Sequence, residues 1–281
     1  MRNGHQLNGH EVNIVRPFIR WAGGKQNLIK VLVKKIPKDF SGRYFEPFLG
    51  AGSLFFAGNF KEAFLSDVNP HLINAFESVK SNPELIFDLL IQHRKKFSVD
   101  YYYTLRKKFN ADKTKFNHEQ AARFIFLVHT SFNGIYRVNR KGEYNVPIGK
   151  IEPNLPELFH LLTVKEKLTN AKLNTVDYDS ILSQVRAGDF VYLDPPYPAL
   201  DGKTQFQQFT IDKFSNNSQV QLALFCNTLS KKGVRVLISN SDIVSIRKLY
   251  RGWRIESTSA IRYVSCKSQR IQVEELLIRN Y

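Results

Sequence analysis

Residues 190–197 combine a buried-strand pattern with groups able to hold a flat, amino-bearing ring. Four apolar residues precede Asp194-Pro195-Pro196-Tyr197, and in open α/β sheets ligands gather where strands end at their carboxyl edge. Asp194 and the carbonyl of Pro195 could accept hydrogen bonds from an exocyclic amine, because the prolines stiffen the turn and bring no amide hydrogen of their own. Tyr197 would supply a stacking face. The alternative is an Asp-Pro-Pro turn that only ends a core strand.

A second group of residues is typical of a nucleoside-binding turn. Gly50-Ala51-Gly52 lies between a predicted strand and a predicted helix, where glycine allows a ligand to approach the backbone because it has no Cβ. Asp67 ends the next predicted strand, at the position where a carboxylate accepts hydrogen bonds from ribose hydroxyls. No Lys-Ser or Lys-Thr follows the glycines, which argues against a phosphate-binding loop. A nucleoside-like cofactor without polyphosphate is favoured, although the glycines alone also fit a plain tight turn.

Two further segments have residue types suited to ligand or DNA binding. In Trp21-Ala22-Gly23-Gly24-Lys25 the glycine pair and the cation could enclose a carboxylate; the alternative is a flexible turn with a solvated lysine. In residues 132–137, Phe132 and Ile135 could wedge between base steps, and Asn133 and Arg137 carry bidentate groups suited to adenine and guanine edges. The alternative there is a set of core aromatics beside a surface arginine.

The elements that would position these residues follow the order of a nucleotide-binding α/β sheet. A strand at residues 43–45 precedes the glycine turn, a helix capped by Ser53 runs to Phe60, and a second strand covers residues 63–67. Pro70 opens the next helix at its first turn. Further strands are predicted at residues 190–193, 234–239 and 273–279. Helices are predicted at residues 219–230 and at 27–36, the latter ended by Pro37.

The middle of the chain is basic and predominantly helical. Between Arg94 and Lys115 there are eight basic and two acidic residues, interleaved with aromatic side chains. Asn117 and Gln120 predict a capping box at the start of a helix that runs through His129. Residues 137–147 flank a glycine turn and predict a β-hairpin that carries three cations. These patterns indicate a basic, helical insert in the α/β sheet.

The composition indicates a globular protein with a polyanionic partner. Lys and Arg number 41 against 25 Asp and Glu, a net charge of +16, which favours nucleic acid as the partner, although solubility alone is an alternative. No run of about 18 apolar residues predicts a membrane span and no signal-like stretch begins the chain, so a cytosolic location is expected. Cys226 and Cys266 lack metal-ligand spacing, so neither a disulfide framework nor a zinc site is expected.

Together these segments resemble the Dam-type, or α-class, site-specific DNA adenine-N6 methyltransferase family, from about Arg16 to the C-terminus. The motifs that carry the resemblance are, in order, Trp21-Ala22-Gly23-Gly24-Lys25, Phe45-Glu46-Pro47-Phe48-Leu49-Gly50-Ala51-Gly52, Ser66-Asp67-Val68-Asn69, Asn133-Gly134, Asp194-Pro195-Pro196-Tyr197 and Ile238-Ser239-Asn240. The resemblance implies a Rossmann-like methyltransferase sheet with helices on both faces and an inserted, mostly helical DNA-recognition domain with a β-hairpin. The expected divisions are a disordered extension at residues 1–15, a catalytic domain at 16–74 and 166–281, and the recognition domain at 75–165.

The resemblance also implies a cofactor and a substrate. Family members bind S-adenosylmethionine, which by the resemblance contacts Trp21, Lys25, Glu46, Phe48, Gly50, Gly52, Asp67, Asp177 and Asp194. Members similar to this pattern methylate adenine in double-stranded DNA within GATC, and the residues expected to touch DNA are Arg20, Phe132, Asn133, Ile135, Arg137 and Pro147. Phe132 stands where the family has tyrosine, which keeps a stacking face and loses a hydroxyl.

The implied reaction extrudes an adenine and stacks it on Tyr197, with Asp194 and the Pro195 carbonyl accepting the two N–H bonds of its amine. No metal and no membrane are expected to take part. The enzyme would be the protective partner of a separate restriction endonuclease or a solitary bacterial or phage methylase, acting on the nucleoid in a prokaryotic cytosol. Two alternatives stay open: a methyltransferase for another amine, such as cytosine N4, a protein glutamine or RNA, and a non-catalytic DNA-binding protein.

Overall fold

The computed structural model describes residues 6–7, 10–11, 14–38, 40–149, 153–198, 214–263 and 270–281, and describes side chains in all of these except 6–7, 10–11, 260–263 and 270–273. Two short strands, β1 (Gln6–Leu7) and β2 (His10–Glu11), pair with each other in antiparallel fashion. The rest of the extension predicted to be disordered, up to residue 13, lies outside the described residues.

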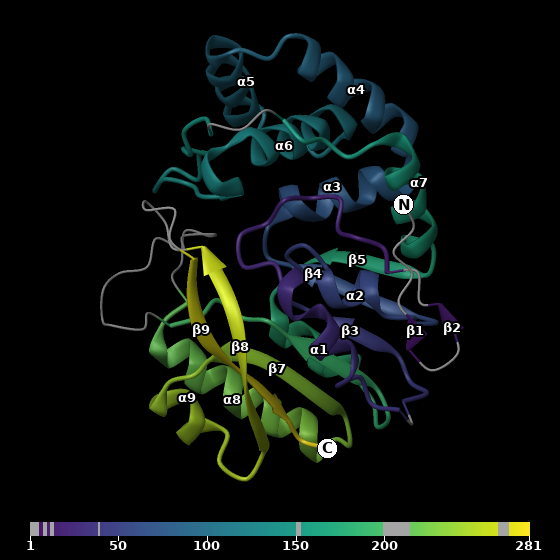
Figure 1. Ribbon diagram of the computed structural model, residues 1–281, viewed down its shortest axis with the longest axis vertical. Helices are drawn as coiled ribbons and strands as arrows, with labels where there is room; N and C mark the ends of the chain where they lie inside the picture. Colours follow the sequence, from purple (N-terminus) through teal and green to yellow (C-terminus); the bar gives the residue numbers. More distant parts are fainter. Residues whose placement is uncertain are drawn as a thin grey trace.

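A seven-stranded mixed sheet forms the centre of the molecule, in the order β5-β4-β3-β6-β7-β9-β8 (Figure 1). The strands are β3 (Tyr44–Glu46), β4 (Ala63–Asp67), β5 (Ala171–Thr175), β6 (Phe190–Leu193), β7 (Arg235–Ser241), β8 (Arg254–Tyr263) and β9 (Arg270–Arg279). Strands β3 to β7 are parallel, and β9 runs antiparallel to both β7 and β8. The chain leaves β3 toward β4 on one side and returns to β6 on the other. The carboxyl ends of β3 and β6 therefore form the switch point where such sheets bind ligands.

Both faces of the central strands are buried. Successive side chains of a strand point to opposite faces, and β6 alternates accordingly, because Phe190 and Tyr192 belong to one apolar cluster and Val191 and Leu193 to the other. This explains why the strand is continuously apolar, as parallel strands covered on both sides are. The α/β fold class expected from the sequence is confirmed.

The helices divide between the sheet and a separate layer, which Figure 1 shows above it. Their bounds are η1 (Gln26–Leu28), α1 (Ile29–Val33), α2 (Ser53–Ala57), α3 (Pro70–Ser81), α4 (Pro83–Lys95), α5 (Val99–Ala111), α6 (His118–Thr130), η2 (Phe132–Gly134), α7 (Leu158–Leu168), η3 (Tyr178–Ser183), α8 (Asn216–Lys231) and α9 (Val244–Leu249). Helices α4, α5 and α6 form the upper layer; α8 lies beside β7, and α9 lies next to α8.

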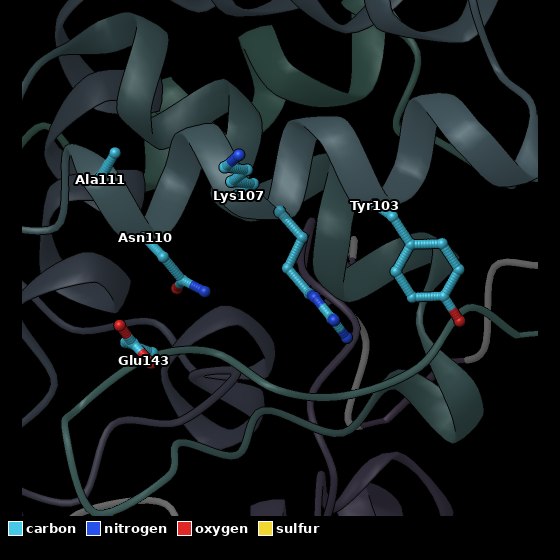
Figure 2. A pocket seen from close by; sticks show the side chains of 6 residues that line it. Tyr103, Lys107, Asn110, Ala111 and Glu143 are labelled. Atoms are coloured by element: carbon cyan, nitrogen blue, oxygen red, sulfur yellow. The ribbon is translucent and has the colours of Figure 1, made fainter.

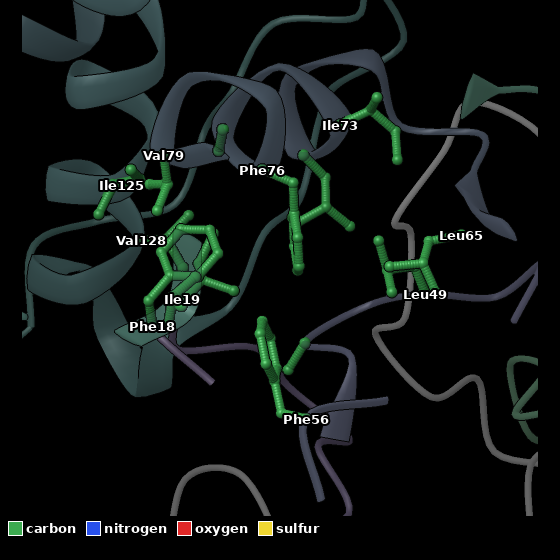
Figure 3. Packing of buried hydrophobic residues seen from close by; sticks show 14 of the residues in the cluster. Phe18, Ile19, Leu49, Phe56, Leu65, Ile73, Phe76, Val79, Ile125 and Val128 are labelled. Carbon is green, nitrogen blue, oxygen red and sulfur yellow. The ribbon is translucent and has the colours of Figure 1, made fainter. Parts of the chain in front are cut away.

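The insert helices share one apolar core with the sheet. Helix α6 contributes Ile125 and Val128 to the same buried cluster as Leu65 of β4, and Phe18 packs edge-on against Phe76 of α3 with 4.9 Å between ring centroids (Figure 3). Continuous packing of this kind resists relative movement, because protein interiors are close-packed. The insert is therefore held at a fixed position relative to the switch point.

Several predicted elements differ from those in the structure. The helix expected at 27–36 is a 3₁₀ turn followed by α1, which ends at Val33 because the amides of Lys35 and Ile36 bond to carbonyls three residues back. Helix α2 ends at Ala57, and its N-cap is Gly52, in the left-handed conformation at φ 68°, instead of Ser53. The hairpin expected at 137–147 has a single antiparallel bridge, Val138 to Tyr144.

The capping box predicted at α6 forms only in part. The side chain of Asn117 accepts a hydrogen bond from the Gln120 amide, but the Gln120 side chain donates to the Phe109 carbonyl on α5 at 2.9 Å instead of reaching back to Asn117. A buried tertiary partner thus replaces the local one. The strand at 63–67, the helix opened by Pro70 and the strand at 190–193 are confirmed.

Candidate active site

The carboxyl end of β6 brings an acid and a buried base together. Asp194 follows Leu193 directly, and its Oδ2 lies 2.8 Å from the Nζ of Lys25. Lys25 is only 7% exposed and also donates to the Gly23 carbonyl at 2.9 Å. Two residues that stand 169 positions apart in the sequence therefore meet at the switch point, as an ion pair that little water can screen.

The second oxygen of Asp194 is available for a ligand. Oδ1 is buried and has no hydrogen-bond partner among the residues that the structure describes. Burial raises the pKa of Asp194, and the Lys25 ammonium opposes that rise. A buried acceptor left unbonded is unfavourable by about 1–3 kcal/mol. A ligand N–H group directed at Oδ1 would recover this free energy.

The turn after Asp194 is held from two sides. Pro195 is buried, and the carbonyl of Pro196 accepts a hydrogen bond of 2.9 Å from the Gln219 side chain on α8. Gln219 in turn accepts from the side chain of Asn240 on β7 at 3.0 Å. These contacts fix the backbone that presents the Pro195 carbonyl and the Tyr197 ring.

Tyr197 lies against the same lysine as Asp194. The Lys25 Nζ is 4.8 Å from the centroid of the Tyr197 ring, which is a cation–π distance. The Tyr197 hydroxyl donates to Oε2 of Glu275 on β9 at 3.0 Å. The ring is thus fixed close to the carboxylate that an amine-bearing ligand would contact.

The glycine turn after β3 is tied to the acid at the end of β4. The Gly50 amide donates to Oδ2 of Asp67 at 3.1 Å and the Asn69 amide donates to Oδ1 at 3.0 Å. Burial raises the pKa of Asp67 to about 6, although these amides oppose the rise. Each carboxylate oxygen can accept a second hydrogen bond, so Asp67 can still receive hydroxyls from a nucleoside.

Trp21 packs directly on this turn. Gly50 has a φ of 46°, and a Cβ added there would lie 3.0 Å from Cδ1 of the Trp21 ring. The indole also stacks on Tyr136, with 5.8 Å between ring centroids and 19° between planes. Trp21 and Gly50, each predicted to contact the cofactor, therefore lie together, with Gly52 in the same turn.

Glu46 forms part of the wall below the site. It is 2% exposed and accepts a hydrogen bond of 2.7 Å from the Tyr44 hydroxyl. Burial raises the pKa of Glu46 to about 8, and the negative charge of Asp194 adds to the rise. At neutral pH Glu46 is mostly protonated, so it adds little negative charge beside Asp194.

Phe48 and Asp177 lie on the β5 side of the switch point. The Phe48 ring stacks on Tyr178, with 5.3 Å between ring centroids and 22° between planes. Asp177 is exposed and caps η3 by accepting a hydrogen bond from the Tyr178 amide at 2.7 Å. Both residues border one aromatic surface, which is compatible with the contact to S-adenosylmethionine expected from the sequence. That contact stays a prediction.

The residues predicted to touch DNA gather after α6. The side chain of Arg20 lies across Gly134, where an added Cβ would be 2.5 Å from the arginine Nε. Asn133 is exposed, with a left-handed φ of 53°, and Ile135 is half-buried. The Phe132 amide donates to the carbonyl of the exposed Pro147 at 2.9 Å.

The segment that carries Arg137 and Pro147 is supported by helix α5. The side chain of Asn110 accepts from the Tyr144 amide at 2.8 Å and donates to the Tyr144 carbonyl at 3.0 Å. Arg106 donates to the Val146 carbonyl at 2.9 Å. The Nε of Arg137 donates to the Asn145 side chain at 2.9 Å. Helix α5 thus substitutes for the missing strand pairs of the predicted hairpin.

An open hollow of about 400 Å³ lies between α5 and this segment (Figure 2). It is lined by Tyr103, Arg106, Lys107, Asn110, Ala111 and Glu143. Figure 2 shows Asn110 and Glu143 on its two sides. Two of the basic side chains predicted for the insert, Arg106 and Lys107, therefore line a hollow next to the segment expected to contact DNA.

Sequence reasoning did not identify four residues that support the site: Asn110, Tyr136, Gln219 and Glu275. The only signal for Glu275 is its place in the predicted final strand, where it stands beside a second acid, Glu274. In the described ranges, no helix is long and apolar enough to cross a membrane, and no three or more His, Cys, Asp or Glu residues cluster as metal ligands would.

The fold is that of an α/β protein whose parallel strands end at a ligand-binding switch point, and comparison with known proteins gives the family. The model of the D12 class N6 adenine-specific DNA methyltransferases matches residues 21–264. The Type II methyltransferase M.MjaIII of Methanocaldococcus jannaschii is 35% identical over 95% of this chain and 99% of its own. The Type II methyltransferase M1.LlaDCHI of Lactococcus lactis subsp. cremoris is 35% identical over 98% of both chains.

Two more distant similarities complete the comparison. The DNA adenine methylase of Escherichia coli K12 is 32% identical over 93% of this chain and 94% of its own. Among solved structures, precorrin-6y C5,15-methyltransferase of Geobacter metallireducens covers 95% of this chain at 8% identity with a TM-score of 0.38, too low to bear on function.

The chain belongs to the D12 class of N6 adenine-specific DNA methyltransferases. The activity of this family is methylation of adenine N6 in DNA, which agrees with the expectation from the sequence. The alternatives of a cytosine-N4, protein or RNA methyltransferase, and of a non-catalytic DNA-binding protein, receive no support from these relatives.

Proposed function

We propose that this enzyme transfers a methyl group from S-adenosylmethionine to N6 of an adenine extruded from duplex DNA, within the sequence GATC. The observation that carries the proposal is the Asp194 carboxylate at the end of β6. Its Oδ2 is held by Lys25, while its buried Oδ1 has no partner in the part of the chain that the structure describes. This is the acceptor that an exocyclic amine requires.

The proposed catalytic residues act on the amine and not on the methyl group. The N6 lone pair is delocalised into the adenine ring and becomes localised on nitrogen as the new bond forms. Asp194 Oδ1 and the Pro195 carbonyl accept the two N–H bonds, which stabilises the charge that develops on nitrogen in the transition state. Stacking on Tyr197 offsets part of the few kcal/mol that base extrusion costs. The methyl–sulfur bond of the cofactor would break as the methyl–N6 bond forms, which leaves a neutral thioether, and the proton that N6 then loses would pass to the Asp194 carboxylate and on to solvent.

The residues at the switch point fit the cofactor. S-adenosylmethionine supplies a methyl group bound to a positively charged sulfur. The buried Lys25 ammonium suits its carboxylate, and Asp67 can accept hydrogen bonds from its ribose while held by two amides. The aromatic surface of Phe48 and Tyr178 suits its adenine. The proposed cofactor contacts are Trp21, Lys25, Glu46, Phe48, Gly50, Gly52, Asp67, Asp177 and Asp194.

The proposed DNA surface is the basic insert at residues 75–165, with the catalytic domain at 16–74 and 166–281. A net charge of +16 supports binding to the phosphate backbone. Target recognition is assigned to the segment after α6, where Arg20 lies across Gly134 and Phe132 bonds to Pro147. The proposed DNA contacts are Arg20, Phe132, Asn133, Ile135, Arg137 and Pro147. GATC is favoured because relatives named DNA adenine methylase match 93% of the chain.

The proposed setting is a prokaryotic cytosol, with the enzyme acting on the nucleoid. Two relatives carry type II methyltransferase names, which supports a role as the protective partner of a separate restriction endonuclease. Relatives named DNA adenine methylase support a solitary methylase instead.

The proposal is tested by methylation-sensitive digestion of DNA from a host without GATC methylation that expresses the chain. One endonuclease is blocked by adenine methylation at GATC and a second cuts the same site regardless of it. Resistance to the first only, lost with Asp194→Ala, is the expected result. If the DNA stays sensitive to the first endonuclease but labelled methyl groups appear elsewhere, the GATC assignment is wrong. If no label enters DNA, the proposed reaction is wrong.

A further inference from the structure

A buried acid on β9 faces the proposed catalytic turn. Glu275 is 3% exposed and lies opposite Ser241, the last residue of β7. Because β9 runs antiparallel to β7, its amino-terminal half reaches the carboxyl edge of the parallel strands, where Asp194 also lies. The antiparallel strand β9 thus places the Glu275 side chain at the switch point. A parallel strand would place a residue near its own start at the opposite edge of the sheet.

The neighbouring acid on the same strand points the other way. Side chains alternate along a strand, so Glu274 faces away from Glu275; it is exposed and accepts a hydrogen bond from Ser259 on β8 at 2.9 Å. Glu275 instead accepts one from the Tyr197 hydroxyl at 3.0 Å. Burial of a carboxylate is unfavourable unless it is hydrogen-bonded, so the position of Glu275 depends on the groups that face it.

We infer that Glu275 is a positioning residue that fixes the Tyr197 ring in the orientation on which the extruded adenine stacks. The inference rests on the stacking role proposed for Tyr197. The backbone of the turn is held by the Gln219 side chain at the Pro196 carbonyl, and the far end of the ring is held by Glu275. A tyrosine ring turns about two side-chain bonds: the hydrogen bond to Glu275 fixes the direction in which the ring points, and a group lying over the ring face opposes rotation about the ring's own long axis. Lys25, 4.8 Å from the ring centroid, lies over the same ring.

The restraint affects the rate more than DNA affinity. The insert and its charged surface are the parts proposed to bind the duplex, whereas the Glu275 side chain bonds to the Tyr197 hydroxyl, and its negative charge also raises the pKa of Asp194. Misorientation of the ring lowers the fraction of bound complexes in which the amine meets Asp194. We expect kcat to fall while the dissociation constant for the duplex is unchanged, because only the reactive geometry is lost.

The test compares variants of Glu275, Tyr197 and Glu274 by methylation kinetics with labelled cofactor on a GATC duplex. Glu275→Ala removes the acceptor, and Tyr197→Phe removes the hydroxyl but keeps the ring. Each is expected to lower kcat by about 10- to 100-fold, as for a lost hydrogen bond to a charged group. The double variant should be no slower than the slower single one, because both remove the same contact. Glu275→Gln keeps an acceptor oxygen and should restore most of the activity, whereas Glu274→Ala is the matched control at the exposed neighbour.

Three outcomes would overturn the inference: a normal kcat for Glu275→Ala, additive losses in the double variant, or a loss in Glu274→Ala equal to that in Glu275→Ala. If Glu275→Ala does not fold, judged by its melting temperature, the comparison of Glu275→Gln with Tyr197→Phe decides. A lower kcat for Glu275→Gln than for Tyr197→Phe then contradicts the inference. Tyr197→Ala separates the two proposals. If it is inactive while Glu275→Ala is normal, only the positioning role fails; if it is fully active, stacking on Tyr197 fails as well.

Discussion

The protonation of Glu46 should make the stability of this enzyme depend on pH. Burial raises the pKa of this side chain from 4.5 to about 8. Each unit by which the pKa of Glu46 differs between the folded and unfolded states corresponds to about 1.4 kcal/mol. Full ionisation of Glu46 therefore opposes folding by about 5 kcal/mol. The folded state binds the Glu46 proton more tightly than the unfolded state does, so protonation of Glu46 stabilises the fold. This stabilisation is fully present below about pH 4.5 and is lost as the pH rises through about 8.

The substitution Glu46→Gln isolates this effect. Glutamine keeps an acceptor for the Tyr44 hydroxyl, which donates to Glu46 at 2.7 Å, and it cannot ionise. Relative to the wild type, the free energy of unfolding of the variant should rise by up to about 1.4 kcal/mol per pH unit between about pH 5 and 8. Above about pH 8 the difference should level off.

The assay is urea unfolding, followed by circular dichroism, of both proteins across this pH range. Glu62→Gln is the matched control for the loss of a carboxylate, since Glu62 is a partly exposed residue paired with Lys172 at 3.1 Å. A difference between Glu46→Gln and the wild type that does not change with pH would refute the raised pKa of Glu46. A difference that falls as the pH rises would contradict the sign of the reasoning.

Three further substitutions test the arrangement around the site. Arg137→Ala should lower discrimination at a guanine of the target by about 1–3 kcal/mol; an equal loss of affinity for every duplex, measured by fluorescence anisotropy, would make it a phosphate contact instead. Asn110→Ala removes both bonds to the Tyr144 backbone and should increase methylation of sites that differ from the target by one base pair; unchanged selectivity in competition assays would show that α5 does not position the recognition segment. Gly50→Ala places a Cβ 3.0 Å from Trp21 at a left-handed φ and should weaken cofactor binding in calorimetry by about 10-fold or more, as backbone strain of about 1–3 kcal/mol implies; unchanged affinity would contradict the close approach of the cofactor to this turn.

Local sequence patterns correctly predicted the strands and helices that are specified by signals within a few neighbouring residues. The strand at 63–67 and the start of α3 at Pro70 have the predicted bounds, because an apolar run and a proline at the first helical turn are local signals. The ligand-binding edge was also predictable. Gly50 and Asp67 meet there because residues at the ends of parallel strands converge on one edge, whereas Lys25 reaches Asp194 from the segment before η1.

Elements and contacts set by tertiary structure were not predictable from local patterns. The edge strand β5 has one buried residue, Ala171, among five, so it lacks a clear apolar alternation. The segment at 137–147 has a single strand bridge of its own and is held in addition by Asn110 of α5. Glu275 contacts Tyr197 because of the register of β9 against β7, and no pattern in the sequence specifies that register.

The most direct test of the mechanism is single-turnover methylation of a GATC duplex by Asp194→Ala, with cofactor and DNA affinities measured in parallel. Removal of the carboxylate takes away the acceptor Oδ1, while the insert and its basic surface stay in place. The mechanism predicts that methyl transfer falls by at least about 10²–10³-fold, as for loss of a group that stabilises developing charge, with DNA affinity nearly unchanged. A transfer rate within about tenfold of the wild type would contradict the role of Asp194 as the acceptor for the adenine amine.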